Sequence, residues 1–415
     1  MDNRRRRRDE EYYIGVSSTR SYSNSRGYSR SRSRKKYKTR LYIRRAIIVA
    51  VCALLIAAVI TLGWLIISGI GKLFSGGSKT NKTETTTAVV VETIPPTPEE
   101  EIFIKPSITD TGEDGERLTE SLYLYNREAF NLFGGSEKSA QYYGKTVNSV
   151  AEYLGSDVTL YSMVVPNHTE YGLPQRVIDN GAASNSQSDN LLAVHRTTNS
   201  SVKDINCYNI LSEHCDDYIY FHTDHHWTSL GAYYAYSAFC EQTNQTAVDI
   251  NSLEKNIIAG FTGTFYRLSG YNSTLANNPD VVEYYTLPNE TYANMKEKMY
   301  SDEITVPVYY SAATAGEGTY GIFCWGDTAQ FVIHSDCNTG KKILMLKDSY
   351  GNAFAPYLTA NYDEVHILDY RYWEGDLKDY IKSNGIDEVL ILNNVMAANT
   401  VQQVNSLAAI TSPAQ

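Results

Sequence analysis

Apolar residues in the C-terminal two-thirds of the chain are grouped in short runs, which polar and glycine-containing segments separate. Each run has five to nine residues and is rich in aliphatic, β-branched or aromatic side chains, as buried strands are. The predicted strands are VTLYSMVVP (158–166), DYIYF (217–221), KILMLK (342–347), EVHILD (364–369) and EVLILN (388–393).

Apolar positions between these runs follow helical spacing. The predicted helices cover residues 136–154, 230–242, 349–362 and 375–385. Gly155 ends the first, Thr228 or Ser229 caps the second, and Gly385 ends the last. Apolar strands that alternate with helices predict an α/β domain in which helices cover both faces of a parallel sheet, in three layers.

The domain pattern covers residues 115–415 and is interrupted at about 250–335, where Tyr, Thr, Asn and Gly are frequent. This interruption predicts an inserted region of loops and antiparallel strands. Residues 72–114 are rich in Ser, Thr, Gly, Pro and Glu, a composition that cannot bury a core. They predict a disordered spacer.

Residues 46–71 are 26 consecutive residues without a charged side chain. A helix of about 20 apolar residues spans a bilayer. The apolar core of a cleaved signal peptide is shorter, and so is the leader before it. The segment therefore predicts one uncleaved transmembrane helix.

Charge divides the chain into a basic tail and an acidic body. Residues 1–45 carry 16 Lys and Arg against 4 Asp and Glu, a net charge of +12; because the whole chain is at −10, the rest carries −22. Basic residues before a spanning helix stay in the cytoplasm, so the domain after it is predicted to be extracellular. The tail is predicted to be disordered and to contact anionic lipid headgroups rather than nucleic acid.

Five cysteines follow the membrane segment, and none of them is part of a C-x-x-C motif. This argues against a zinc ribbon or a thioredoxin-like redox site. An odd number leaves at least one thiol unpaired within the chain, and spacing alone assigns no disulfide.

Ser349 follows a predicted buried strand and precedes a predicted helix, in KDSYGN. At such a position the free amides of a helix N-terminus favour a developing oxyanion, so Ser349 is a candidate nucleophile. The alternative is a plain helix cap. A serine becomes nucleophilic only beside a base, so the choice depends on a histidine.

Asp224 and His226 are the candidate partners, in FHTDHHW. Two residues apart at the end of an extended strand, they are predicted to point the same way, and His225 the opposite way. The aspartate could orient the imidazole as in a Ser-His-Asp triad. The alternative is a pair of histidines satisfied at a strand end.

A metal site is a further alternative, because His222, Asp224 and His226 alternate and could supply N and O ligands to zinc. All ligands would then come from one short strand, which is an awkward geometry, and the chain has no H-E-x-x-H motif. The sequence therefore favours a site without metal or other cofactor.

TDHHWTSLGAYYAY (223–236) and the serine block LKDSYGNAFAPYLTANYDEVHILDYRYW (346–373) carry a resemblance. They resemble the DHHW protein family of Gram-positive bacteria, which is similar to the SGNH-hydrolase-like domains of alginate O-acetyltransferases. MVVPNHTEYGLP (163–174) and FTGTFYRLSGY (261–271) resemble weaker shared segments. The resemblance implies a three-layer, flavodoxin-like SGNH fold.

Carried over to this chain, the resemblance makes Ser349 the nucleophile, His226 the base and Asp224 its orienting partner. Ordinary SGNH enzymes have Gly-Asp-Ser where this chain has Lys-Asp-Ser, and their Asn and Gly blocks have no clear counterpart. The amides of Ser349 and Gly351 are the candidate oxyanion donors. Asn167 and Arg371 are further candidates for oxyanion or substrate contacts.

The function predicted is therefore that of a membrane-anchored extracellular O-acetyltransferase or esterase. The resemblance implies a cell-wall or exported polysaccharide as substrate and a membrane-bound acyltransferase as partner. Two alternatives stay open: a non-catalytic glycan-binding or scaffold protein, whose tyrosines would stack on sugars, and a metal-dependent hydrolase.

Overall fold

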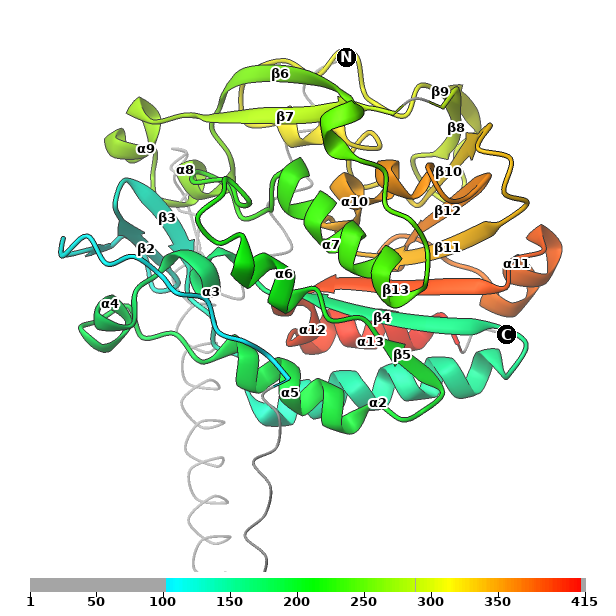
Figure 1. Ribbon diagram of the computed structural model, residues 1–415, viewed down its shortest axis with the longest axis horizontal. Coiled ribbons are helices and arrows are strands. Elements are labelled where there is room, and N and C mark those ends of the chain that lie inside the picture. The colour runs from blue at the N-terminus through cyan, green and yellow to red at the C-terminus, as the bar shows by residue number, and fades with distance from the viewer. Residues whose placement is uncertain (1–101, 288, 412–415) are drawn as a thin grey trace, which may run out of the picture. The chain divides into compact units, whose positions relative to one another are not determined.

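The structure, a computed structural model, describes residues 102–287 and 289–411 (Figure 1). The basic tail, the predicted membrane segment and residues 72–101 of the predicted spacer lie outside these ranges. In the part of the chain that is described, no helix is long and apolar enough to cross a membrane.

Within the described residues, the main sheet has eight strands in the order β5-β4-β13-β11-β12-β10-β8-β9. They are β4 (Thr159–Val165), β5 (Val202–Asp204), β8 (Thr291–Lys296), β9 (Ile304–Val306), β10 (Gln330–Ser335), β11 (Lys342–Lys347), β12 (Glu364–Asp369) and β13 (Glu388–Asn394). The first five in the sheet order are parallel, and the last three join antiparallel. The α/β class is confirmed, but the sheet is mixed because strands from the interrupted region extend one edge.

Helices cover both faces of this sheet (Figure 1). One face carries α2 (Glu137–Leu154), α5 (Gln187–Thr197), α12 (Val395–Ala398) and α13 (Val401–Ala409), and the other carries α7 (Ser229–Gln242) and α10 (Gly351–Leu358). The Thr228 hydroxyl caps α7 by accepting from the Gly231 amide, as predicted. Helix α11 (Leu377–Asn384) ends at Gly385, as predicted, and this glycine adopts a left-handed conformation.

The remaining elements surround this core. Strands β1 (Glu116–Arg117), β2 (Leu122–Tyr125) and β3 (Glu128–Asn131) form an antiparallel sheet, and β6 (Glu254–Phe261) pairs with β7 (Asp280–Thr286). The short helices are α3 (His168–Gly172), α4 (Gln175–Asp179), α6 (Tyr208–Glu213), α8 (Thr264–Leu268) and α9 (Ser273–Asn277).

The order of the parallel strands has a simple relation to a known one. If β11 is counted first and β12, β13, β4 and β5 follow, the sheet order becomes 2-1-3-4-5, the flavodoxin-like order. In chain order, the fourth and fifth strands of this arrangement, β4 and β5, come before the first three, β11, β12 and β13. In such sheets, ligands bind at the carboxyl ends of strands 1 and 3, where the order reverses. Here those strands are β11 and β13.

The strand predicted at residues 217–221 is wrong. This segment makes only an isolated bridge, between Tyr220 and Trp227, and is otherwise irregular. Its apolar side chains, including Phe221, are buried without joining a sheet. The apolar run correctly indicated burial, but its backbone bonds go to the turn that follows it: the Phe221 amide donates to the His226 carbonyl.

Candidate active site

Ser349 lies in the turn between β11 and α10, at the sheet edge where the strand order reverses. It is partly exposed, whereas its neighbour Asp348 is buried. One Asp348 carboxylate oxygen accepts from the Tyr350 amide at 2.9 Å, and the other accepts from the backbone and side-chain amides of Asn394, each at 2.8 Å. Asp348 thus joins the ends of β11 and β13. Burial raises the pKa of its carboxyl, although Arg371 and these amides act in the opposite direction.

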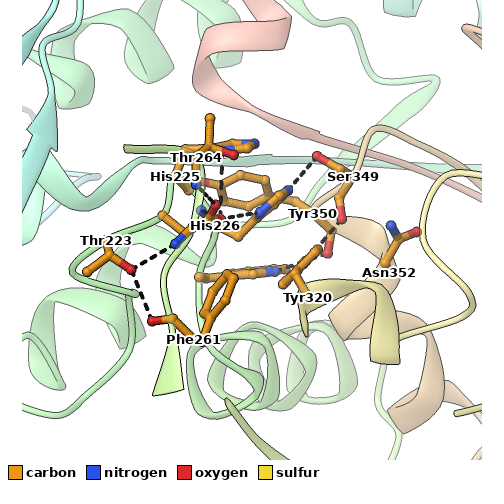
Figure 2. Close-up of polar contacts among 12 residues, drawn as sticks. Thr223, His225, His226, Phe261, Thr264, Tyr320, Ser349, Tyr350 and Asn352 are labelled. Atoms are coloured by element: carbon orange, nitrogen blue, oxygen red, sulfur yellow. Dashed lines mark hydrogen bonds and ion pairs between the residues drawn. The ribbon is translucent and has the colours of Figure 1, made fainter. Parts of the chain in front are cut away.

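The structure brings Ser349 to the predicted base (Figure 2). His226 Nε2 lies 2.8 Å from Ser349 Oγ, and His226 Nδ1 lies 2.6 Å from Asp224 Oδ1. Because a carboxylate only accepts, the ring proton sits on Nδ1, and Nε2 is left to accept from the serine hydroxyl. The base and the orienting carboxylate come from a turn rather than from the predicted strand end.

Asp224 is held by contacts from inside and outside the motif. Its Oδ1 also accepts from the His226 amide at 3.0 Å, and its Oδ2 accepts from the Thr264 amide at 2.7 Å. A Cβ at Gly263 would lie 2.3 Å from Asp224 Cβ, so this close approach requires glycine. Burial raises the Asp224 pKa, but His225, His226 and these hydrogen bonds lower it further, so that it lies well below its usual range.

Asp280, at the start of β7, fixes the turn before Asp224. Its carboxylate accepts from the His222 and Thr223 amides at 2.8 and 2.7 Å, and from the hydroxyls of Thr223 and Tyr218. Residues 261–271 and Asp280 therefore support the site from the interrupted region. The resemblance of residues 261–271 was the one sequence signal for part of this support, and nothing marked Asp280.

The prediction that His225 points away from His226, which assumed an extended strand, is wrong. The ring centroid of His225 lies 3.8 Å from that of His226, and its Nδ1 lies 3.7 Å from Asp224 Oδ1. The turn replaces the alternation that an extended strand would impose. Burial, followed by the charge of His226, lowers the pKa of His225 to about 4.

Two further aromatic residues, Tyr320 and Trp227, contact the site. The Tyr320 ring is stacked on His226, with centroids 3.7 Å apart and planes at 6°. The Tyr320 hydroxyl donates to the Ser349 carbonyl at 3.0 Å, and Trp227 Nε1 donates to the Tyr350 carbonyl, also at 3.0 Å. These contacts link the turn that carries Asp224 and His226 (the base turn) to the turn that carries Ser349 (the serine turn), in addition to the bond of the Ser349 hydroxyl itself.

The candidate oxyanion residues are arranged differently from the prediction. The Gly351 amide already donates to the Asp348 carbonyl at 3.1 Å, so it is not free for an oxyanion. For the Ser349 amide, no acceptor is found within the described ranges, so this donor is available. Asn167 caps α3 and donates to the Asn131 carbonyl, in a role that is structural.

Arg371 is part of a partly buried ion network near the serine turn, in which Lys347 and Asp369 are buried and Asp327 is exposed. Arg371 donates to both carboxylate oxygens of Asp369, at 2.8 and 2.6 Å, and pairs with Asp327 at 2.9 Å. Lys347 pairs with the same two carboxylates, at 2.9 and 3.2 Å. These contacts place Arg371 in the scaffold that supports the serine turn.

A metal could be held by a different set of residues from the one considered on sequence. The ligand atoms of Asp224, His225 and His226 lie within 4.8 Å of one another, whereas His222 Nε2 lies 3.7 Å from a Glu128 oxygen instead. In the observed arrangement both ring nitrogens of His226 are already engaged, by Asp224 and by Ser349. The geometry therefore matches a hydrogen-bonded relay more closely than a ligand set.

The five cysteines that the structure describes are all free. Cys207, Cys240 and Cys324 are buried, and burial raises the pKa of each thiol, to about 12 for Cys207 and Cys324 and to about 11 for Cys240. No disulfide therefore joins any two of these five cysteines.

Comparison with solved structures identifies similar folds. A DHHW family protein from Eubacterium siraeum is 28% identical, with a TM-score of 0.65, and the match covers 71% of this chain and 97% of that one. Bacillus cereus PatB1, in a form with a sulfonyl adduct, is 19% identical, with a TM-score of 0.56 and coverage of 68% and 98%; at this identity the likeness shows the fold alone. The search of the curated proteins found no match.

The family model described as DHHW protein matches residues 100–368, more than half of the chain. This range includes the base turn, the segment that supports Asp224, and the serine turn. The chain belongs to the DHHW protein family.

Proposed function

We propose that this protein is a serine acyl-ester enzyme of the SGNH type, an O-acetyltransferase or esterase that acts on cell-wall or exported polysaccharide. Residues 46–71 would anchor it in the cell membrane with the domain outside. The observation that carries the proposal is the pair of hydrogen bonds that links Asp224, His226 and Ser349. They join Asp224 Oδ1 to His226 Nδ1 at 2.6 Å and His226 Nε2 to Ser349 Oγ at 2.8 Å. These are the distances that a base and its orienting group need for nucleophilic catalysis.

In the first half-reaction, His226 Nε2 takes the Ser349 proton while Oγ attacks the acyl carbonyl. Asp224 keeps the ring oriented and stabilises the imidazolium. The Ser349 amide would donate to the tetrahedral oxyanion. The alcohol of the donor ester then leaves with the proton from His226, and an acyl-serine remains.

In the second half-reaction, His226 deprotonates a sugar hydroxyl or water, which attacks the acyl-serine; the ester bond to Ser349 then breaks, and His226 returns the proton to the Ser349 Oγ. A sugar acceptor makes the protein a transferase, and water makes it an esterase; both need the same residues. The chain after residue 45 carries −22, so a neutral or cationic glycan approaches more easily than a polyanion. A membrane-bound acyltransferase is the partner proposed to supply acetyl groups.

The test uses the detergent-solubilised full chain with p-nitrophenyl acetate. We expect turnover to fall at least about 10³-fold in Ser349→Ala and in His226→Ala, because the members of such a unit fail together. Ser200→Ala, an exposed serine, is the matched control. A sulfonyl fluoride, chosen because PatB1 forms a sulfonyl adduct, should modify Ser349 in a peptide identified by mass spectrometry.

Two outcomes would contradict the proposal. Turnover that survives Ser349→Ala would exclude the serine as nucleophile, and turnover abolished by a chelator and restored by zinc would favour the metal-dependent alternative. To separate transferase from esterase, the acetyl ester is supplied with a neutral glycan. Acetylated glycan indicates transfer, and free acetate alone indicates hydrolysis.

A further inference from the structure

The imidazole of His226 lies between two other rings. Tyr320 is parallel to it at 3.7 Å, and His225 is tilted by 37° at 3.8 Å. Two rings cannot occupy one face of an imidazole at these distances, so Tyr320 and His225 lie on opposite faces. We call this arrangement, Tyr320–His226–His225, the aromatic sandwich.

The sandwich controls a degree of freedom that the hydrogen bonds do not. The bond from Nδ1 to Asp224 holds one ring nitrogen, but a combined change of the two side-chain torsions of His226 can still tilt the plane of the ring about that nitrogen. Such a tilt would move Nε2 away from Ser349 Oγ, which it must meet within about 10–20° of the productive angle. Rings packed on both faces prevent it.

Tyr320 also contacts the nucleophile side of the site. Its ring lies on the base, and its hydroxyl donates to the Ser349 carbonyl at 3.0 Å. One buried side chain therefore sets the position of His226 relative to the Ser349 backbone. Figure 2 shows Tyr320 between the base turn and the serine turn.

The segment that carries Tyr320 is itself fastened to the serine turn. Downstream, Cys324, Trp325 and Gly326 take left-handed backbone angles, with φ of 49°, 62° and 77°. Non-glycine residues adopt this conformation at a cost, which surrounding contacts must offset. The turn delivers the Asp327 carboxylate to Asn352 Nδ2 at 3.1 Å and to Lys347 Nζ at 3.2 Å. Both partners flank the serine turn.

We propose that Tyr320 and His225 are positioning residues, which hold the plane of the His226 ring so that Nε2 faces the Ser349 hydroxyl. The inference rests on the proposed serine chemistry and goes beyond the Ser-His-Asp set. It gives His225, the first histidine of the DHHW motif, a function distinct from that of the base His226. Neither residue exchanges a proton with the substrate.

The test compares variants that keep a ring with variants that remove it, in the full chain with the acetyl ester. Tyr320→Phe keeps the stack and loses one hydrogen bond, so we expect kcat to stay within about fivefold of wild type. Tyr320→Leu removes the stack, and kcat should fall by about 30–100-fold with KM changed less than about twofold, because a misaligned base forfeits part of the 10²–10⁴-fold that general-base catalysis supplies. His225→Phe should retain more activity than His225→Ala, by about tenfold.

The matched control is Tyr309, a tyrosine of the same region whose hydroxyl donates to the Tyr285 carbonyl at 2.6 Å, away from His226. Tyr309→Leu should leave kcat within about twofold even if it lowers the melting temperature. The rate of Ser349 modification by the sulfonyl fluoride should follow kcat across the Tyr320 and His225 variants, because it needs the same oriented base. A fall in melting temperature alone would not produce that correlation.

The inference is overturned if Tyr320→Leu keeps wild-type kcat, or if Tyr320→Phe falls as far as Tyr320→Leu, since the hydroxyl would then be the active group. If Tyr320→Leu does not fold, the His225 pair decides: equal kcat in His225→Ala and wild type overturns the sandwich. If the Ser349→Ala variant turned over the acetyl ester as fast as the wild type, the result would instead contradict the proposed function. The two failures are therefore distinguishable.

Discussion

The two oxygens of Asp224 serve different partners. Oδ1 accepts from the ring and the amide of His226, and Oδ2 accepts from the Thr264 amide. Neighbouring histidines and these donors outweigh the effect of burial on its pKa, so the carboxylate stays ionised at neutral pH. In the proposed mechanism it would therefore orient and stabilise the imidazole and would not itself take the proton.

His225 makes folding sensitive to acid. Its pKa of about 4 lies below the value of 6.5 expected in an unfolded chain, so between these values the unfolded chain binds a proton that the folded domain does not. Stability is then highest above pH 6.5 and falls as the pH drops toward 4, by up to about 3 kcal/mol from this group. We expect urea unfolding at pH 7, 6 and 5 to show a smaller loss in His225→Phe.

His195 provides a control, because its protonation changes the folding stability in the opposite direction to that of His225. Its hydrogen bond to Asp204, 2.8 Å long, raises its pKa. Its contribution is therefore present below the unfolded pKa and disappears as the pH rises. His195→Phe should steepen the loss of stability on acidification, and a loss unchanged in both variants would contradict the assignment of the acid sensitivity to His225.

The sequence indicated those candidate site residues that a short local motif marks. The spacing of Asp224 and His226 and the place of Ser349 after a strand pointed to one site, and the structure brings the three together. Tyr320, Gly263 and Asp280 were missed because their roles depend on tertiary contacts across about 30 to 100 residues. A buried tyrosine, a turn glycine and an aspartate at a strand start are too common to be singled out.

At the level of secondary structure, β11 delivers both a buried cation and the serine turn. Lys347 is 1% exposed and pairs with Asp369, which is fully buried, and with Asp327. Removing one partner of a buried ion network leaves an uncompensated charge. The network therefore makes the end of β11 sensitive to substitution.

We expect Lys347→Met to destabilise the protein by about 3–5 kcal/mol, measured by urea unfolding. The matched control is Lys342→Met at the other end of the same strand, where the pair with Glu364 is 3.0 Å long but about a third exposed on the lysine side. That change should cost less than about 1 kcal/mol. Similar losses in both variants would show that the buried network contributes no more than a surface pair.

Strand prediction succeeded for apolar segments at the centre of the sheet. It failed for an apolar segment that is buried outside the sheet. KILMLK and EVHILD are buried on both faces and form β11 and β12 as predicted. DYIYF is also apolar, but its backbone hydrogen bonds go to the turn that follows it, around Trp227, and not to a strand of the sheet. Strands β8, β9 and β10, which extend the sheet on one side, escaped prediction in detail because polar residues line their partly exposed side.

For the whole molecule, the open prediction is the membrane anchor at residues 46–71. We expect the full chain to fractionate with membranes and to be released by deletion of this segment, because a 26-residue uncharged stretch is long enough to span a bilayer. A C-terminal tag should be digested by protease added to intact protoplasts, as the positive-inside rule requires. A full chain in the soluble fraction, or a protected tag, would contradict the topology.

The place of β13 in the sheet governs when the domain can fold during synthesis. This strand is made last, yet it fills the gap between β4 and β11, so β4 waits for about 220 residues before its neighbour exists. At roughly 5–20 residues per second the wait is on the order of 10–45 s. Throughout it, β4 presents an unpaired apolar edge, and Ser349 lacks the Asn394 brace on its turn. The nascent chain thus can neither close its main sheet nor brace the serine turn until its last segment emerges.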